Sequence, residues 1–115
     1  MAITRNEQAE YTHWRPEETK LIEGVPVRFR DICVHTIRLG DVEDPDLWVG
    51  ESLWKWQNSE SGKYIMEHAV EPPYWTRHTD TWNYGYQYKI MARLSEKDQV
   101  FWELKWGGCS SHQRK

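Results

Sequence analysis

The two residue runs Tyr84–Arg93 and Gln99–Trp106 constrain the fold most strongly. Each alternates apolar and polar residues, and a short polar turn separates them. Because successive side chains of a strand point to opposite faces, this period of two predicts a β-hairpin with one aromatic face. Pairing Ala92 with Val100 also brings opposite charges together on the reverse face, so one register satisfies both faces. The hairpin is therefore expected to be a structural part of an antiparallel sheet.

The composition gives large rings an unusual share of the apolar surface. Only 38% of the residues are hydrophobic, yet there are eight Trp and six Tyr against two Phe. Such rings serve equally well as core and as contact surface, and most of them must build the core here. The length of 115 residues suits one domain, which we place at 1–106 with a flexible tail over 107–115.

Further strands are expected upstream. Val25–Leu39 is strand-like, with two slips in its apolar phase that indicate bulges or a bend. Trp48–Gln57 and Lys63–Val70 are expected to form a second hairpin, which Pro72 and Pro73 terminate because proline cannot sit inside a paired strand.

The N-terminal region is expected to supply a helix. Glu17–Glu23 has the composition of a short helix that ends at Gly24, and it has too few apolar residues to be stable unless it packs on a sheet. The resulting fold class is α+β, mainly β. About five antiparallel strands would form a curved sheet or half barrel, with the short N-terminal helix packed on one face.

Charge and motifs exclude several classes. A net charge of −3 and a pI near 5.9 argue against nucleic-acid binding through bulk charge, although a local basic patch remains an alternative. The chain has no membrane-length apolar run and no secretion signal, so a cytoplasmic protein is expected. Cys33 and Cys109 make neither a disulfide framework nor a zinc motif, and we expect no cofactor and no metal.

Two histidines are candidates for acid–base chemistry. His68 would lie on the aromatic face of the second hairpin, and His78 in an expected loop over 74–81. With Arg77 to stabilise negative charge, the pair could cleave a phosphodiester without a metal. No Gly-rich phosphate loop, GxSxG elbow or HExxH motif supports a reaction. The same loop is a candidate binding site through Tyr74, Trp75, Arg77, His78 and Asp80.

Four carboxylates crowd the segment before the second hairpin. They are Asp41, Glu43, Asp44 and Asp46. The glycine and glutamate that a calcium loop of the EF-hand type requires are absent from the corresponding positions. A solvated acidic loop, or an acidic contact patch for a basic partner, is the better interpretation.

Three rings could form a stacking platform. Trp54, Trp56 and Tyr64 resemble in composition the surfaces that stack sugars or bases. The neighbouring Lys55 and Lys63 are offset by glutamates, which weakens the nucleic-acid interpretation.

The sequence favours a non-catalytic binding protein that engages a macromolecular partner, most simply a protein, through aromatic and acidic patches. Its size would suit a viral or phage accessory protein, and a homodimer through a sheet face or edge strand is a variant. One alternative is the hydrolase based on His68 and His78. Another is a small-molecule carrier with an aromatic-lined pocket between Tyr84, Trp102 and His68.

Overall fold

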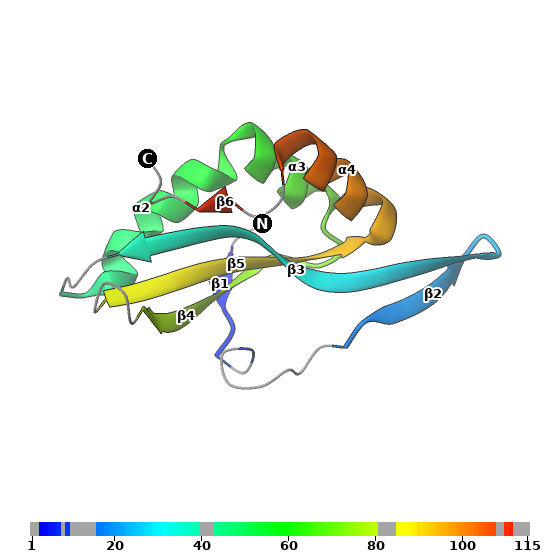
Figure 1. Ribbon diagram of the computed structural model, residues 1–115. Helices are drawn as coiled ribbons and strands as arrows, with labels where there is room; N and C mark the ends of the chain where they lie inside the picture. Colours follow the sequence, from blue (N-terminus) through cyan, green and yellow to red (C-terminus); the bar gives the residue numbers. More distant parts are fainter. Residues whose placement is uncertain are drawn as a thin grey trace.

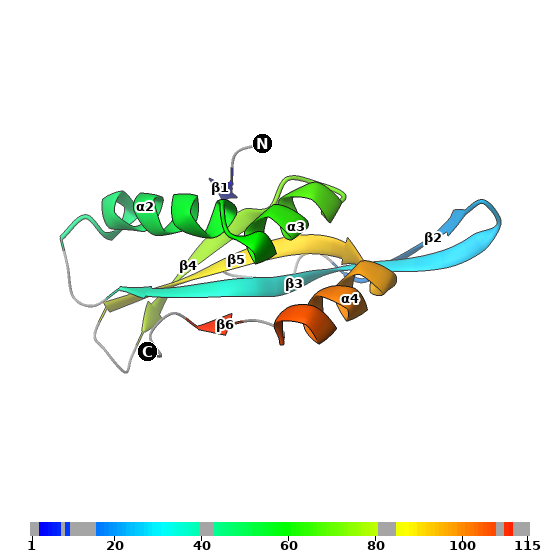
Figure 2. The same cartoon turned by 90° about the horizontal axis from the view of Figure 1, so that it is seen from above.

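A mixed β-sheet carries the helices on one of its faces (Figures 1 and 2). The computed structural model describes residues 3–7, 9, 16–39, 43–80, 85–107 and 110–111. The strands lie in the order β1-β4-β5-β3-β2, and β6 pairs with β3. In chain order the elements are β1 (Thr4–Arg5), β2 (Glu18–Ile22), β3 (Val25–Leu39), α2 (Pro45–Gln57), α3 (Glu60–His68), β4 (Tyr74–Asp80), β5 (Gly85–Ser95), α4 (Glu96–Trp106) and β6 (Ser110–Ser111).

The expected α+β class is confirmed, but two details of the expected fold are wrong. The sheet is not all antiparallel, because β1 pairs with β4 and β6 pairs with β3 in parallel. The helices that cover the sheet come from the middle and the C-terminal part of the chain. The segment Glu17–Glu23, expected to be helical, instead contributes β2.

Strands β2 and β3 form a hairpin with a two-residue turn. Ile22 pairs with Val25, and the intervening Glu23 and Gly24 have φ angles of 53° and 80°. Two consecutive positive φ angles define the type I′ turn, which matches the twist of paired strands. Residues 25–28 of β3 pair with β2 alone among the described strands. The hairpin Glu18–Phe29, called the arm below, therefore projects from the sheet (Figure 1).

Strand β3 continues into the centre of the sheet, as expected for Val25–Leu39. It pairs antiparallel with β5, and the register shifts between Cys33 and His35. This irregularity confirms one of the expected phase slips. Both Val34 and His35 are buried at the shift, and the His35 ring stacks on Trp56 of α2 at 5.8 Å between centroids. The bulge thus turns two neighbouring residues towards the helices.

The expected hairpin over Trp48–Gln57 and Lys63–Val70 is wrong, since both segments are helical. The two helices meet in a tight turn at Ser59, whose hydroxyl donates to the Trp56 carbonyl at 2.6 Å and accepts from the Gly62 amide at 3.1 Å. Gly62 lies so close to the end of α2 that a Cβ there would be 1.8 Å from the Trp56 carbonyl oxygen. A side chain at position 62 is therefore incompatible with this turn.

Gly50, in the middle of α2, has the opposite environment. It is exposed, and a Cβ there would meet no atom within 4 Å. Gly50→Ala should therefore raise the free energy of unfolding by about 0.5–1 kcal/mol, because alanine restricts the unfolded chain and favours the helix. Urea unfolding of the two proteins measures this. An unchanged or lower stability would contradict the described environment of Gly50.

The returning strand expected over Gln99–Trp106 is also wrong, because that segment belongs to α4. The helix begins after Ser95, whose hydroxyl accepts from the Asp98 amide at 3.3 Å, and ends at Gly107 with φ 77°. The expected register between Ala92 and Val100 is therefore not formed. Strand β5 pairs with β3 and β4 instead.

The alternation in β5 nevertheless identifies its buried face. Tyr88, Ile90, Ala92 and Leu94 are completely buried and face the helices. The core cluster is completed by residues of β3 and of all three helices, namely Val34, Ile37, Val49, Trp56, Ile65 and Trp102. The aromatic face expected from the sequence is thus an ordinary core, consistent with its period of two.

The opposite face of the sheet holds a buried ion pair. Arg93 donates to Asp31 at 2.8 Å, and both side chains are more than nine-tenths buried. The second carboxylate oxygen of Asp31 accepts from the Tyr74 hydroxyl at 2.8 Å. Arg93 also donates to the carbonyl of Pro16 and to Glu18, each within 3.2 Å. Arg93 thereby fastens the base of the arm to the centre of the sheet.

Candidate functional site

Helix α2 has apolar side chains on both its inner and its outer face. Val49 and Trp56 are buried against the sheet, whereas Leu47, Trp48 and Trp54 are 78%, 58% and 65% exposed. Leu47 and Trp54 are seven residues apart, so they lie two turns from each other on the same side of the helix. A surface helix ordinarily has a polar outer face. The outer face of α2 departs from that rule.

Several carboxylates lie near these exposed apolar residues in the sequence. Glu43 and Asp44 are exposed just before the helix, Asp46 lies in its first turn, and Glu51 lies between Leu47 and Trp54. Lys55 forms an ion pair with Glu51 at 3.7 Å. We call Leu47, Trp48 and Trp54, with their acidic neighbours Glu43, Asp44, Asp46 and Glu51, the α2 outer face.

The expected acidic patch is thus placed beside exposed rings, apart from Asp41, which lies outside the described residues. Within this patch Asp46 also has a structural task. Its carboxylate accepts from the Tyr88 hydroxyl at 2.5 Å and from Arg77 at 3.2 Å. Burial, and then the hydrogen bond to Asp46, raise the pKa of Tyr88 above its usual range.

Arg77 of β4 lies beside the first turn of α2, where it contacts Asp46. Its guanidinium lies over the Tyr86 ring, 4.9 Å from the centroid. An open hollow of about 550 Å³ lies beside it, lined by Asp44, Asp46, Leu47 and Arg77. The contacts with Asp46 fix the start of α2 on the sheet, so the outer face is carried by a rigid element.

The expected platform of Trp54, Trp56 and Tyr64 is not one surface. Trp54 is exposed on the outer side of α2, whereas Trp56 is 5% exposed on the inner side. Tyr64 belongs to α3, and its ring stacks on those of His68 and Phe101 with centroid distances of 3.9 and 5.2 Å. Of the three rings, only Trp54 belongs to the α2 outer face.

The expected loop over 74–81 is wrong, because Tyr74–Asp80 forms strand β4. Its side chains alternate between the two faces of the sheet. The Trp75 ring lies on the helix side, 5.2 Å from the Tyr88 ring between centroids. Arg77 lies on the same side, where it contacts Asp46. Tyr74 and His78 lie on the other side, and the position of the Asp80 side chain is outside the described residues. These candidates therefore do not form one binding surface.

The two histidines of the hydrolase alternative are also separated. His68 ends α3 in the helix layer, where its Nδ1 lies 2.9 Å from the Tyr64 carbonyl oxygen. The Nε2 of His78 lies 2.9 Å from Thr76 Oγ1 on the face of the sheet away from the helices. The sheet lies between the two imidazoles. The arrangement that this alternative requires, with both rings at one substrate, is not formed.

The pocket of the carrier alternative is not formed by its described members. Trp102 is 2% exposed, and its indole nitrogen donates to Ser61 at 3.1 Å between α4 and α3. Tyr84 lies outside the described residues. Within the described part of the chain, no group of three His, Cys, Asp or Glu residues could hold a metal ion. No helix in that part is long and apolar enough to cross a membrane.

Sequence reasoning missed Leu47 and Trp48, since a strand was expected to begin there. The available signal was a helix start, with Asp44 before Pro45 and an acidic residue in the first turn. No family model matches this sequence, and comparisons with curated proteins and with solved structures find no significant match.

Proposed function

We propose that this protein is a non-catalytic binding protein that engages a basic segment of another protein through the α2 outer face. The observation that carries the proposal is the exposure of Leu47, Trp48 and Trp54 on one rigid helix. Exposed apolar patches rimmed by polar residues mark interaction sites. Tryptophan is also among the residues that contribute most to binding energy when an interface covers them.

The carboxylates specify the kind of partner. Glu43 and Asp44 lie just before the helix, and Glu51 lies one turn after Leu47. These exposed carboxylates would attract a partner with Lys or Arg beside its own apolar side chains. Such complementarity mainly accelerates association and excludes partners of the wrong charge. Arginine side chains can also stack on tryptophan rings. The affinity should therefore fall as the salt concentration rises.

Replacement of the exposed rings tests the proposal. Partners are captured from a lysate of the native source, and the dissociation constant of each purified partner is measured by titration calorimetry. Trp48→Ser and Trp54→Ser should each weaken binding by about tenfold or more, because buried tryptophans are frequent hot spots. Their stabilities should stay within about 0.5 kcal/mol of the parent, since both rings are exposed.

Val70→Ser is the matched control. Val70 is 51% exposed and lies between α3 and β4, where its amide donates to the carbonyl of Arg93 in β5. Val70→Ser removes an exposed apolar side chain, although a smaller one than tryptophan, from another surface, so the affinity of this variant should equal that of the parent. Parent-like affinity in both tryptophan variants would contradict the assignment of the α2 outer face.

A further inference from the structure

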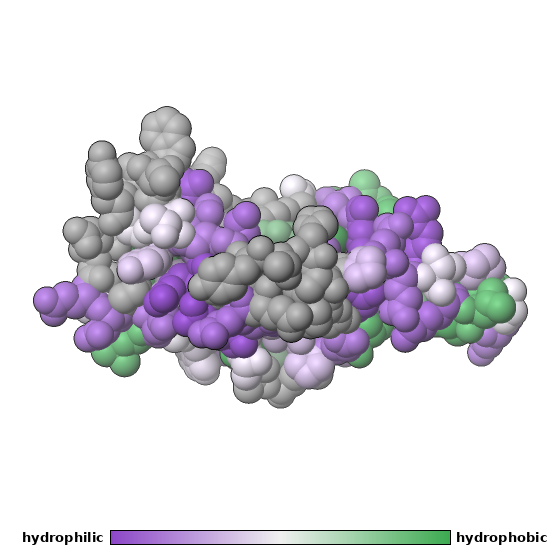
Figure 3. All heavy atoms as spheres, turned by 90° about the horizontal axis from the view of Figure 1, so that it is seen from below, coloured by the Kyte–Doolittle hydropathy of each residue, from purple (hydrophilic) through white to green (hydrophobic). Residues whose placement is uncertain are grey.

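The tip of the arm is apolar and has no cover among the described residues. Leu21, Ile22 and Val25 are 74%, 47% and 59% exposed at the end of the hairpin. The surface view shows apolar residues at this far end of the molecule (Figure 3, green, at the right). Ile22 and Val25 are paired across the hairpin and share one of its faces, whereas Leu21 lies on the other face. Exposed apolar residues at one projecting end of a molecule mark an interaction site.

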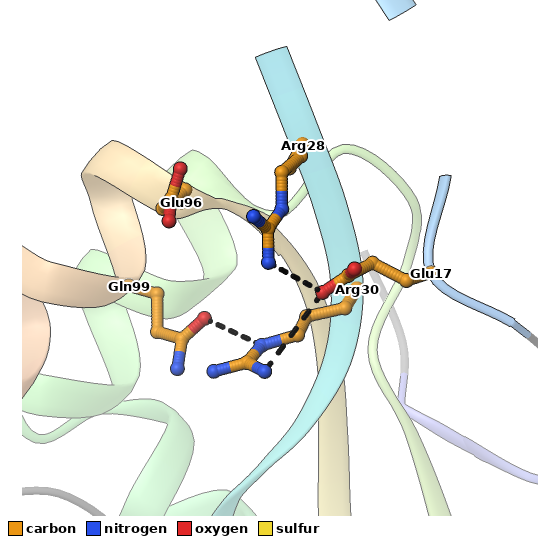
Figure 4. A pocket seen from close by; sticks show the side chains of 5 residues that line it. All are labelled: Glu17, Arg28, Arg30, Glu96 and Gln99. Carbon is orange, nitrogen blue, oxygen red and sulfur yellow. Dashed lines mark hydrogen bonds and ion pairs between the residues drawn. The ribbon is translucent and has the colours of Figure 1, made fainter. Parts of the chain in front are cut away.

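The base of the arm is tied to the body near α4. The Glu17 carboxylate forms ion pairs with Arg28 at 3.3 Å and Arg30 at 3.9 Å, and Arg30 Nε donates to Gln99 of α4 at 2.9 Å (Figure 4). Together with the contacts of Arg93 to Glu18, these bonds hold the hairpin in its projecting direction. The tip is therefore presented outward.

Helix α4 carries a second exposed apolar stripe. Val100, Phe101 and Leu104 are 49%, 49% and 83% exposed. With Lys97 they occupy positions i, i+3, i+4 and i+7, which form one outward face. This stripe and the arm belong to the same half of the molecule (Figures 1 and 2).

We propose that two copies of this chain associate by exchanging arms, so that the tip of each arm packs on the α4 stripe of the other copy. Since both patches lie in one half of the molecule, a single twofold axis can satisfy both contacts. Glu23 in the turn carries the charge opposite to Lys97 in the stripe. The second copy is therefore complementary in charge as well as apolar character.

The available area agrees with a dimer. At roughly 100 Å² per side chain, Ile22, Val25 and the three α4 residues provide about 500 Å² per copy, or about 1,000 Å² in total, the area that a specific interface should reach. Neighbouring residues of the arm would add to this area. The proposal does not depend on the function proposed above, because the α2 outer face stays free in each copy. A dimer would present two such faces and could bind a repeated partner with avidity.

Sedimentation equilibrium of the full chain, at protein concentrations up to about 100 µM, tests the proposal. The parent should be a dimer. Glu23→Lys and Lys97→Glu should each raise the dimer dissociation constant about tenfold or more, and the double variant should restore it. Glu23 and Lys97 are both exposed, so far-ultraviolet circular dichroism should be unchanged. A monomeric parent, or a double variant that is no better than the singles, would overturn the exchange of arms.

Discussion

Gly62→Ala is expected to lower the free energy of unfolding by about 3 kcal/mol or more, the upper range for overpacking. The new Cβ would lie 1.8 Å from the Trp56 carbonyl oxygen and 3.1 Å from the Cα of Gln57. Both are backbone atoms, so no side-chain rotation can relieve the overlap. The end of α2 must shift away from α3, and Trp56 would lose part of its packing in the core.

Gly50→Ala is the matched control, because it makes the same chemical change in α2, at a position where the new Cβ meets no other atom. Urea unfolding of both variants should show opposite signs, a loss for position 62 and a gain for position 50. If Gly62→Ala were as stable as the parent, the close approach of α3 to the end of α2 would be wrong.

Arg93→Met should cost about 3–5 kcal/mol, the typical effect of removing one partner from a buried ion pair. The Asp31 side chain is 8% exposed, so its carboxylate would stay desolvated without its cation. The variant also loses the hydrogen bonds from Arg93 to Pro16 and Glu18. The base of the arm should therefore be held less firmly against the sheet.

Adding Asp31→Leu to Arg93→Met separates the cost of the uncompensated carboxylate from the loss of the other hydrogen bonds of Arg93. The double variant should be more stable than Arg93→Met, because the uncompensated carboxylate is gone. Thermal unfolding of the two single variants and the double variant measures the coupling. Strictly additive losses would mean that Asp31 and Arg93 do not act as a pair.

The sheet was predictable where a strand is buried on one face. In β5 the alternation of Tyr88, Ile90 and Ala92 identified the core, and the apolar run of β3 even indicated its bulge. The expectation of a helix at Glu17–Glu23 is wrong because Gly24 resembles a helix stop in the sequence. Beside Glu23 it forms a hairpin turn instead, and the two roles of glycine have the same local sequence signal.

Helices α2 and α4 were mistaken for strands because of their exposed apolar residues. Trp54 and Trp56 suggest a period of two, yet one is on the outer and the other on the inner face of α2. Val100, Trp102 and Leu104 give the same false alternation in α4. An apolar outer face removes the 3.6-residue period on which helix prediction depends. Three of the misread segments, α2, α4 and the arm, carry the proposed contact surfaces.

The structure places the members of the predicted site on several surfaces, so only some of them belong to the α2 outer face. Trp54 is exposed on α2, and the exposed residues Glu43, Asp44 and Asp46 lie just before that helix or in its first turn. Arg77 and His78 could not be separated without knowing that they alternate along a strand. Their assignment to opposite faces depends on long-range pairing with β5, which no local pattern encodes.

The dissociation constant of Gly50→Arg for a captured partner tests the α2 outer face most directly. Gly50 lies three residues after Leu47 and four before Trp54, and its surroundings are open, so arginine should preserve or stabilise the helix. A long cation among these rings and carboxylates should repel a basic partner and weaken binding about tenfold or more, whereas Gly50→Ala should bind like the parent. Equal dissociation constants for Gly50→Arg and Gly50→Ala would contradict the proposed function.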